Sequence, residues 1–169
     1  AVAAGTPEGF PACDGPVFVY AGTVAQWLAP EIFVDAFELA RARLGDARLV
    51  FVGQGSGWDA LAERSRGLAG VEMIPAVSAW EADRWMARAS ATLASLRPGG
   101  YDYAYPTKIL ASLAQGTPVI YAGPGQAASD VRDAGLGVAC SLDASQVAEA
   151  MVAFASDAVT WAGAEGVRA

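Results

Sequence analysis

The chain has 169 residues, and its 11 basic residues against 18 acidic ones give a formal charge of −7 without any histidine. Hydrophobic residues make up 54% of the sequence and charged residues 17%, which excludes intrinsic disorder and is typical of one packed globular domain. An acidic chain without a basic stripe is a poor partner for nucleic acid. Without histidine, the chain has neither a Ser-His nor a Cys-His pair, and no imidazole metal ligand.

The two cysteines, Cys13 and Cys140, lie far apart and neither belongs to a CxxC pair, which favours a reducing cytoplasmic location. The uncharged stretch between Lys108 and Asp130 is long enough to test as a membrane span, but its glycines and prolines predict helix, turn, strand and turn. We also find no secretory signal. The sequence begins with Ala1 instead of methionine, which suggests a processed protein or an excised piece of a longer one.

Residues 1–16 are rich in Gly, Pro and Ala without periodicity, and we expect them to form a linker. The folded domain is expected over residues 17–157, followed by a C-terminal tail at 158–169. Its first segment, Val17-Phe18-Val19-Tyr20-Ala21, is short, β-branched and aromatic, which is typical of a strand buried on both faces. Further strands are predicted at 49–52, 71–74, 91–96, 118–121 and 137–140. Helices are predicted from Pro30 to the turn at Gly45 and near 57–67, 78–89, 106–115, 126–134 and 143–156.

Six strands alternating with helices predict an α/β fold: a doubly wound, Rossmann-like parallel sheet of about six strands with helices on both faces. Ligands of such sheets bind outside the carboxyl ends of the strands. We therefore look for function in the loops after residues 21, 52, 74, 96 and 121.

Two of these loops carry glycines that allow two interpretations. Gly53-Gln54-Gly55-Ser56-Gly57 resembles a dinucleotide fingerprint with Glu72 at about the distance of a ribose ligand, but the third glycine is misplaced and Trp58 follows it. The alternative is a tight turn whose amides face an anion. Gly22 after the first strand either lets a ligand approach the backbone or only adopts a positive φ.

Lys108 is the only lysine, and it falls in the first turn of a predicted helix. The helix dipole repels a cation at that end, so the position is best explained by an incoming phosphate or carboxylate. The alternative is that Lys108 extends into solvent beside Asp102. The helix carries no charge after Lys108, which predicts burial against the sheet.

The order of these motifs resembles the C-terminal half of GT-B glycosyltransferases of the family 4, or group 1, type. The similarity extends over residues 17 to about 155. Its motifs are Val19-Tyr20-Ala21-Gly22, Val52-Gly53-Gln54-Gly55, Val71 to Pro75, Pro106-Thr107-Lys108-Ile109 and Ala114-Gln115-Gly116-Thr117-Pro118-Val119-Ile120.

The resemblance implies a domain that binds a nucleotide-diphosphate sugar for transfer to a polysaccharide, lipid or other cell-envelope acceptor. It also implies an amino-terminal acceptor-binding domain, absent from this chain, which could associate with a membrane surface, so we expect no turnover by this chain alone. No cofactor and no protein-supplied metal ligand are implied. Lys108 is expected to stabilise the leaving diphosphate catalytically. The residues expected to bind the donor are Gly22, Thr23, Gly53, Gly55, Arg97, Asp102, Pro106, Thr107 and Lys108.

The sequence departs from the family where ribose-binding glutamates are common, because Tyr103 and Ala111 occupy those positions. A methyl group cannot accept the ribose hydrogen bonds, so Asp102 is the substitute we consider. A non-catalytic module with a degenerate donor site is one alternative, and an NAD-binding oxidoreductase domain is another. Trp161, in the tail, is either part of a loose segment or a docking contact.

Overall fold

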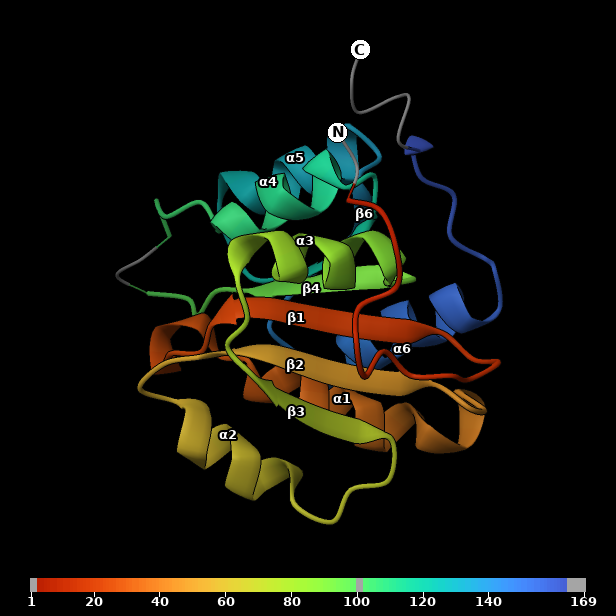
Figure 1. The fold of residues 1–169 in the computed structure, drawn as a ribbon. Coiled ribbons are helices and arrows are strands. Elements are labelled where there is room, and N and C mark those ends of the chain that lie inside the picture. The colour runs from red at the N-terminus through yellow and green to blue at the C-terminus, as the bar shows by residue number, and fades with distance from the viewer. Residues whose placement is uncertain (1–2, 100–101, 164–169) are drawn as a thin grey trace.

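The computed structural model describes residues 3–99 and 102–163, and in this part of the chain it contains one sheet of six parallel strands (Figure 1). The spatial order is β3-β2-β1-β4-β5-β6, which confirms the predicted doubly wound fold. The strands are β1 Val17–Thr23, β2 Arg48–Gln54, β3 Val71–Pro75, β4 Ala91–Ser95, β5 Val119–Ala122 and β6 Gly137–Cys140. The helices are α1 Glu31–Ala40, α2 Trp58–Ser65, α3 Ala79–Arg88, α4 Thr107–Ala114, α5 Gln126–Asp133 and α6 Ala144–Ala155.

Helices cover both faces of the sheet, as predicted. In Figure 1, α1, α2 and α6 lie on one side of the strands and α3, α4 and α5 on the other. The alternation of side chains along β1 explains this arrangement: Phe18 and Tyr20 join the core under α1 and α6, whereas Val17 and Val19 pack with Trp85 of α3. Both faces of the strand are therefore buried, which is why its sequence is a continuous apolar run.

The helix after Lys108 was predicted to be buried against the sheet, and this is only partly correct. Ile109 and Ser112 of α4 are buried, but Leu110 is 57% exposed. The uncharged sequence therefore describes a helix with one buried face and an apolar outer face. Ser112 is held by a hydrogen bond from its hydroxyl to the Thr117 carbonyl at 2.9 Å.

The loop after β1, the first candidate loop, lies where the order in which the chain adds strands to the sheet reverses. The chain runs from β1 outward to β3, and β4 then returns to the other side of β1. Strands β1 and β2 pair as far as Thr23 and Gln54, whereas β1 and β4 pair only at Phe18–Ala91 and Val19–Thr92. Because β1 and β4 part beyond Val19, a crevice opens at the carboxyl edge of the sheet, where doubly wound folds bind ligands.

Residues 3–16 cross the carboxyl end of α3 and lie against the domain (Figure 1). The ring of Phe10 lies 5.2 Å from that of Trp85, and the Arg84 guanidinium donates to the carbonyls of Ala4 at 3.1 Å and Thr6 at 2.7 Å. Whatever precedes this chain, these fourteen residues are anchored to the sheet domain by aromatic packing and hydrogen bonds.

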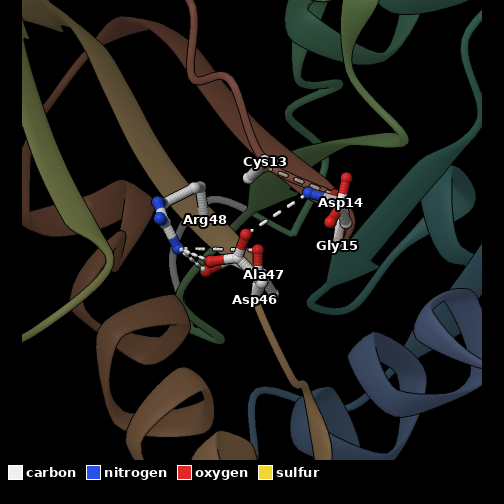
Figure 2. Close-up of polar contacts among 6 residues, drawn as sticks. All are labelled: Cys13, Asp14, Gly15, Asp46, Ala47 and Arg48. Atoms are coloured by element: carbon white, nitrogen blue, oxygen red, sulfur yellow. Dashed lines mark hydrogen bonds and ion pairs between the residues drawn. The ribbon is translucent and has the colours of Figure 1, made fainter.

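The opposite end of the strands, the amino edge of the sheet, is closed by a polar cluster that Figure 2 shows. Arg48 donates to the Asp46 carboxylate at 2.6 Å, and the same carboxylate accepts the Asp14 amide at 3.3 Å. The Cys13 thiol points to the Gly15 carbonyl, and partial burial raises its pKa. Both cysteines are free thiols, as expected from their spacing.

The described part of the tail returns to the sheet domain. The Ala162 amide donates to the Gly135 carbonyl at 2.7 Å, and Trp161 is half-buried at the amino edge. The rest of the predicted tail, residues 164–169, lies outside the described residues. Within the described part, none of the helices is long and apolar enough to cross a bilayer.

Candidate functional site

A groove lies at the carboxyl edge of the sheet, between α3 and α4 and over the end of β1. Its first part is a hollow of about 330 Å³. The lining residues are Ala21, Gly22 and Thr23 of β1, Ala79, Ala82, Asp83 and Met86 of α3, and Thr107, Lys108 and Ala111 of α4. A second hollow of about 290 Å³ shares Gly22, Thr23, Ala79 and Ala82 and continues over the end of β2 at Gly53 and Gln54. Together they reach the size of small-molecule sites.

Lys108 is half-buried in this groove. Its Nζ lies 4.9 Å from the centre of the Tyr20 ring, in a cation–π contact. Burial lowers the pKa of Lys108 to about 8, because the low-dielectric surroundings disfavour the charged form. Within the described part of the chain, no carboxylate pairs with Lys108. The alternative prediction, in which Lys108 extends into solvent beside Asp102, is therefore wrong.

The amino end of α4 presents open backbone donors beside Lys108. Thr107 is the exposed first residue of the helix, and Pro106 before it has no side chain that can cap the N–H groups. Unsatisfied N–H groups and the positive end of the helix dipole attract anions. An anion in the groove would thus meet both the ammonium of Lys108 and the first turn of α4.

Gly22 supplies the opposite wall of the groove. Its φ is +113°, a backbone conformation that favours glycine, and a Cβ built there would lie 3.5 Å from the Lys108 Nζ. Any larger side chain at this position would fill the space above the ammonium. Thr23 follows Gly22 at the same rim and is exposed.

Gly53 and Gly55, by contrast, face protein. A Cβ at Gly53 would come within 1.9 Å of the Gly22 carbonyl oxygen, and one at Gly55 within 2.1 Å of the Val24 carbonyl oxygen. The glycines after β2 are therefore needed for close packing onto the loop after β1. Gly53 still lines the second hollow, whereas Gly55 lines neither hollow of the groove.

Two further predicted residues lie away from the groove. Arg97 forms an ion pair with Glu31 at 2.5 Å and donates to the Gln26 carbonyl at 3.2 Å, so Glu31 already neutralises its guanidinium. Asp102 is exposed and accepts the Gly99 amide at 2.9 Å. The structure thus brings together Gly22, Thr23, Gly53, Thr107 and Lys108, and it separates Gly55, Arg97 and Asp102 from them.

The position of Glu72 weighs against the dinucleotide interpretation. Glu72 is the second residue of the edge strand β3 and pairs with Val50 near the amino end of the strands, whereas the β2–β3 pairing runs on to Gly53 and Pro75. A carboxylate that binds ribose should lie at the carboxyl ends of the strands. Glu72 does not.

A larger hollow of about 570 Å³ lies at the amino edge, lined in part by Asp14, Ser90, Asp157 and Trp161. Its only ionisable side chains are carboxylates. By volume alone the amino edge would be the better ligand site, whereas the charged groups favour the carboxyl edge. We favour the smaller groove, because it combines a cation with a helix amino end at the edge where these sheets bind ligands.

Sequence analysis missed Asp83, which lines the groove from α3. The spacing of Ala79, Ala82, Asp83 and Met86 places them on one helix face, but the sequence does not show whether that face lies toward a groove or toward solvent. Among the described residues, no group of three or more His, Cys, Asp and Glu side chains is arranged to hold a metal ion.

Comparison with known proteins identifies the class. The family model described as "Glycosyl transferases group 1" matches residues 15–157, so the chain belongs to the group 1 glycosyltransferases. Among solved structures, it is similar to the C-terminal domain of the group 1 protein LpcC from Francisella tularensis, with a TM-score of 0.68 and 16% identity. That match covers 85% of this chain and 76% of the solved LpcC domain.

Two longer proteins match as well. The lipopolysaccharide outer core galactosyltransferase WaaB has a TM-score of 0.72 and 19% identity, with 99% of this chain and 49% of WaaB covered. HepE from Anabaena, in complex with UDP, has a TM-score of 0.74 and 17% identity, with 92% and 43% covered. The chain thus spans less than half of either protein. A search of curated proteins found no match. The shared fold is that of the C-terminal domain of a GT-B glycosyltransferase.

Proposed function

We propose that this domain binds a nucleotide-diphosphate sugar in the groove between α3 and α4, as the donor-binding half of a glycosyltransferase. The observation that carries the proposal is the unpaired, half-buried Lys108 beside the amino end of α4, facing Gly22 across the groove. A diphosphate needs charge neutralisation and N–H donors, and this position supplies both.

The similarity to HepE supports the nature of the ligand, since HepE was solved with UDP and with UDP-glucose. The pneumococcal O-GlcNAc transferase GtfA, in complex with UDP and GlcNAc, also matches 99% of this chain at a TM-score of 0.71. From these complexes we infer that the ligand of the present groove is also a nucleoside diphosphate.

The proposed chemistry is glycosyl transfer. The bond between the sugar's anomeric carbon and the β-phosphate oxygen breaks while the acceptor oxygen bonds to that carbon, and negative charge grows on the leaving diphosphate. The proton of the acceptor hydroxyl passes to that leaving diphosphate. Lys108 and the first N–H groups of α4 would stabilise that charge, with no base required from this domain. The acceptor, a polysaccharide, lipid or other cell-envelope molecule, would come from an amino-terminal domain, and we expect no turnover by this chain alone. We propose a cytoplasmic location.

A non-catalytic module is the second candidate, and Ala111 favours it. This residue lines the groove beside Lys108 with a methyl group where the resemblance leads us to expect a carboxylate, and Tyr103 is 86% exposed. In that case the groove would not bind nucleoside diphosphates.

Calorimetric titration of the chain with UDP, GDP, ADP and NAD distinguishes these possibilities. We expect one nucleoside diphosphate to bind, at up to millimolar Kd, and Lys108→Ala to weaken it at least about tenfold. Arg88→Ala is the matched control, because Arg88 is an exposed cation that does not line the groove. Failure of all three diphosphates to bind, or equal loss in the two variants, would contradict the proposal. Binding of NAD alone would favour the oxidoreductase alternative.

A further inference from the structure

Asp83 is the second ionisable side chain in the first hollow of the groove. It lies on the face of α3 that Ala79, Ala82 and Met86 share, and Lys108 is the only other titratable residue that lines this hollow. Its side chain is half-buried, and the alanines that line the hollow beside it carry only methyl groups. The groove therefore has an anionic wall on α3 and a cationic wall on α4.

No protein group of the described chain neutralises Asp83. The next residue, Arg84, is fully engaged elsewhere: it pairs with Glu81 at 2.8 Å, donates to the carbonyls of Ala4 and Thr6, and stacks on Trp80. Asp83 itself has neither a hydrogen-bond donor nor an ion-pair partner within residues 3–99 and 102–163. A carboxylate that lines a groove and accepts no hydrogen bond from the protein has both oxygens available to a ligand that brings donors.

Outside the base, the donor has hydroxyls that can donate on its ribose and on the sugar to be transferred, and only those of the ribose are present in every nucleoside diphosphate. The phosphates are acceptors, which Asp83 would repel, whereas the ribose has two neighbouring hydroxyls that can both donate. An ionised carboxylate has two acceptor oxygens and can take both hydrogen bonds. Ala111, which faces the hollow from α4, has no acceptor in its side chain.

We propose that the Asp83 carboxylate accepts hydrogen bonds from the 2′ and 3′ hydroxyls of the donor's ribose. The proposal rests on the proposed function, and it fixes the orientation of the nucleotide. The ribose lies toward α3 and the diphosphate toward Lys108 and α4, because the reverse orientation would place phosphate against a carboxylate. Asp83 thereby becomes the residue that selects a ribonucleotide over its deoxy analogue.

The test compares UDP with 2′-deoxy-UDP by calorimetry, and GDP and ADP with their 2′-deoxy forms if UDP does not bind. The wild-type chain should bind the ribonucleotide about tenfold more tightly, the typical effect of losing one hydrogen bond to a charged group. The Asp83→Ala and Asp83→Asn variants should bind the ribonucleotide more weakly, with an affinity close to that for the deoxy analogue. The ratio of the two Kd values should therefore fall toward one.

Two control variants separate this effect from general damage. Asp133→Asn makes the same change at an exposed residue of α5 that does not line the groove, and it should keep the wild-type ratio. Lys108→Ala should weaken both nucleotides by the same factor, because it acts on the diphosphate that they share.

The outcomes distinguish the two proposals. If a nucleoside diphosphate binds and depends on Lys108 but the ribose ratio is unchanged by the Asp83 substitutions, the Asp83 assignment is wrong and the proposed function stands. A ratio near one in the wild-type chain overturns the assignment without any variant, so it stays testable even if an Asp83 variant fails to fold. If no nucleoside diphosphate binds, both proposals fail.

Discussion

The two ends of the same parallel strands differ in how their polar groups are used. At the amino edge, Asp46 is paired with Arg48 and the Asp14 amide (Figure 2). The Ser90 hydroxyl there accepts the Val17 amide at 3.0 Å. At the carboxyl edge, Lys108 and Asp83 line a groove, and neither has an ion-pair partner in the described chain.

The requirements of a stable fold do not explain why the charged side chains at the carboxyl edge lack ion-pair partners. Both edges are rims of one sheet, and the amino edge shows that this chain can satisfy its polar groups where only structure is required. Burial disfavours the charged form of Lys108, and titratable groups perturbed in this way are typical of ligand sites. The splaying of β1 from β4 beyond Val19 adds the space that the ligand needs.

The largest expected effect concerns the glycines that were candidates for phosphate binding. Gly53→Ala should destabilise the domain by about 3 kcal/mol or more, because the new Cβ would overlap the Gly22 carbonyl, which is backbone and cannot move aside. Gly57→Ala in the same loop should cost about 1 kcal/mol or less, since its Cβ would meet a Val24 methyl at 3.3 Å. Urea denaturation measures both. Unchanged stability in Gly53→Ala, with nucleotide binding lost, would instead give Gly53 a direct ligand role.

The Lys108→Met variant should make the domain more stable and weaken nucleotide binding. Because burial lowers the pKa of Lys108 to about 8 from its usual 10.5, the unfolded chain binds more protons than the folded chain between these values. The charged lysine therefore destabilises the wild type fully below pH 8, and the penalty fades as the pH rises toward 10.5. At pH 7 the variant should gain on the order of 2 kcal/mol, discounted for partial solvent exposure, and lose nucleotide affinity.

Denaturation of both proteins at pH 7 and pH 10 checks this prediction. The stability difference should shrink at the higher pH. A variant that is less stable than the wild type at pH 7 would mean that Lys108 stabilises the fold and is not held for a ligand.

The pH dependence of nucleotide binding should follow the same group. Diphosphate oxygens attract the ammonium and not the neutral amine, so affinity for a bound nucleoside diphosphate should fall once the pH exceeds about 8, by up to about tenfold per pH unit. The terminal phosphate, with a pKa near 6, is already ionised there. Calorimetry between pH 7 and pH 9.5 measures the change, and a flat profile would show that Lys108 does not contact the ligand.

The smallest effect is expected at the amino edge. Asp46→Ala removes the partner of Arg48 at an exposed position, so stability should fall only slightly and nucleotide affinity should stay unchanged. A large loss of nucleotide affinity in this variant would mean that the amino edge, with its larger hollow, takes part in binding.

The fold could be predicted from the sequence because each strand is a short apolar run and each helix has its own periodicity. All six strands and six helices lie where they were predicted, whereas the short 3₁₀ turns at Gln26–Leu28 and Arg41–Arg43 had no separate signal. Lys108 could be found because a lysine in a first helical turn contradicts the helix dipole.

The rest of the site depends on tertiary contacts. Nothing in the sequence shows that Arg97 pairs with Glu31, or that Gly53 faces the Gly22 carbonyl. Asp83 was missed because it lies in a charged, amphipathic helix whose solvent and groove sides can be told apart only once α3 is placed beside α4.

The central claim is that the carboxyl edge, and not the amino edge, binds a nucleoside diphosphate. Amide chemical-shift mapping by NMR during titration with UDP, GDP and ADP tests it directly. We predict that one of them shifts Gly22, Thr23, Asp83, Thr107 and Lys108, and that Lys108→Ala abolishes these shifts. Shifts confined to Ser90, Gly116 and Trp161 around the larger hollow, or none with any of the three, would contradict the account.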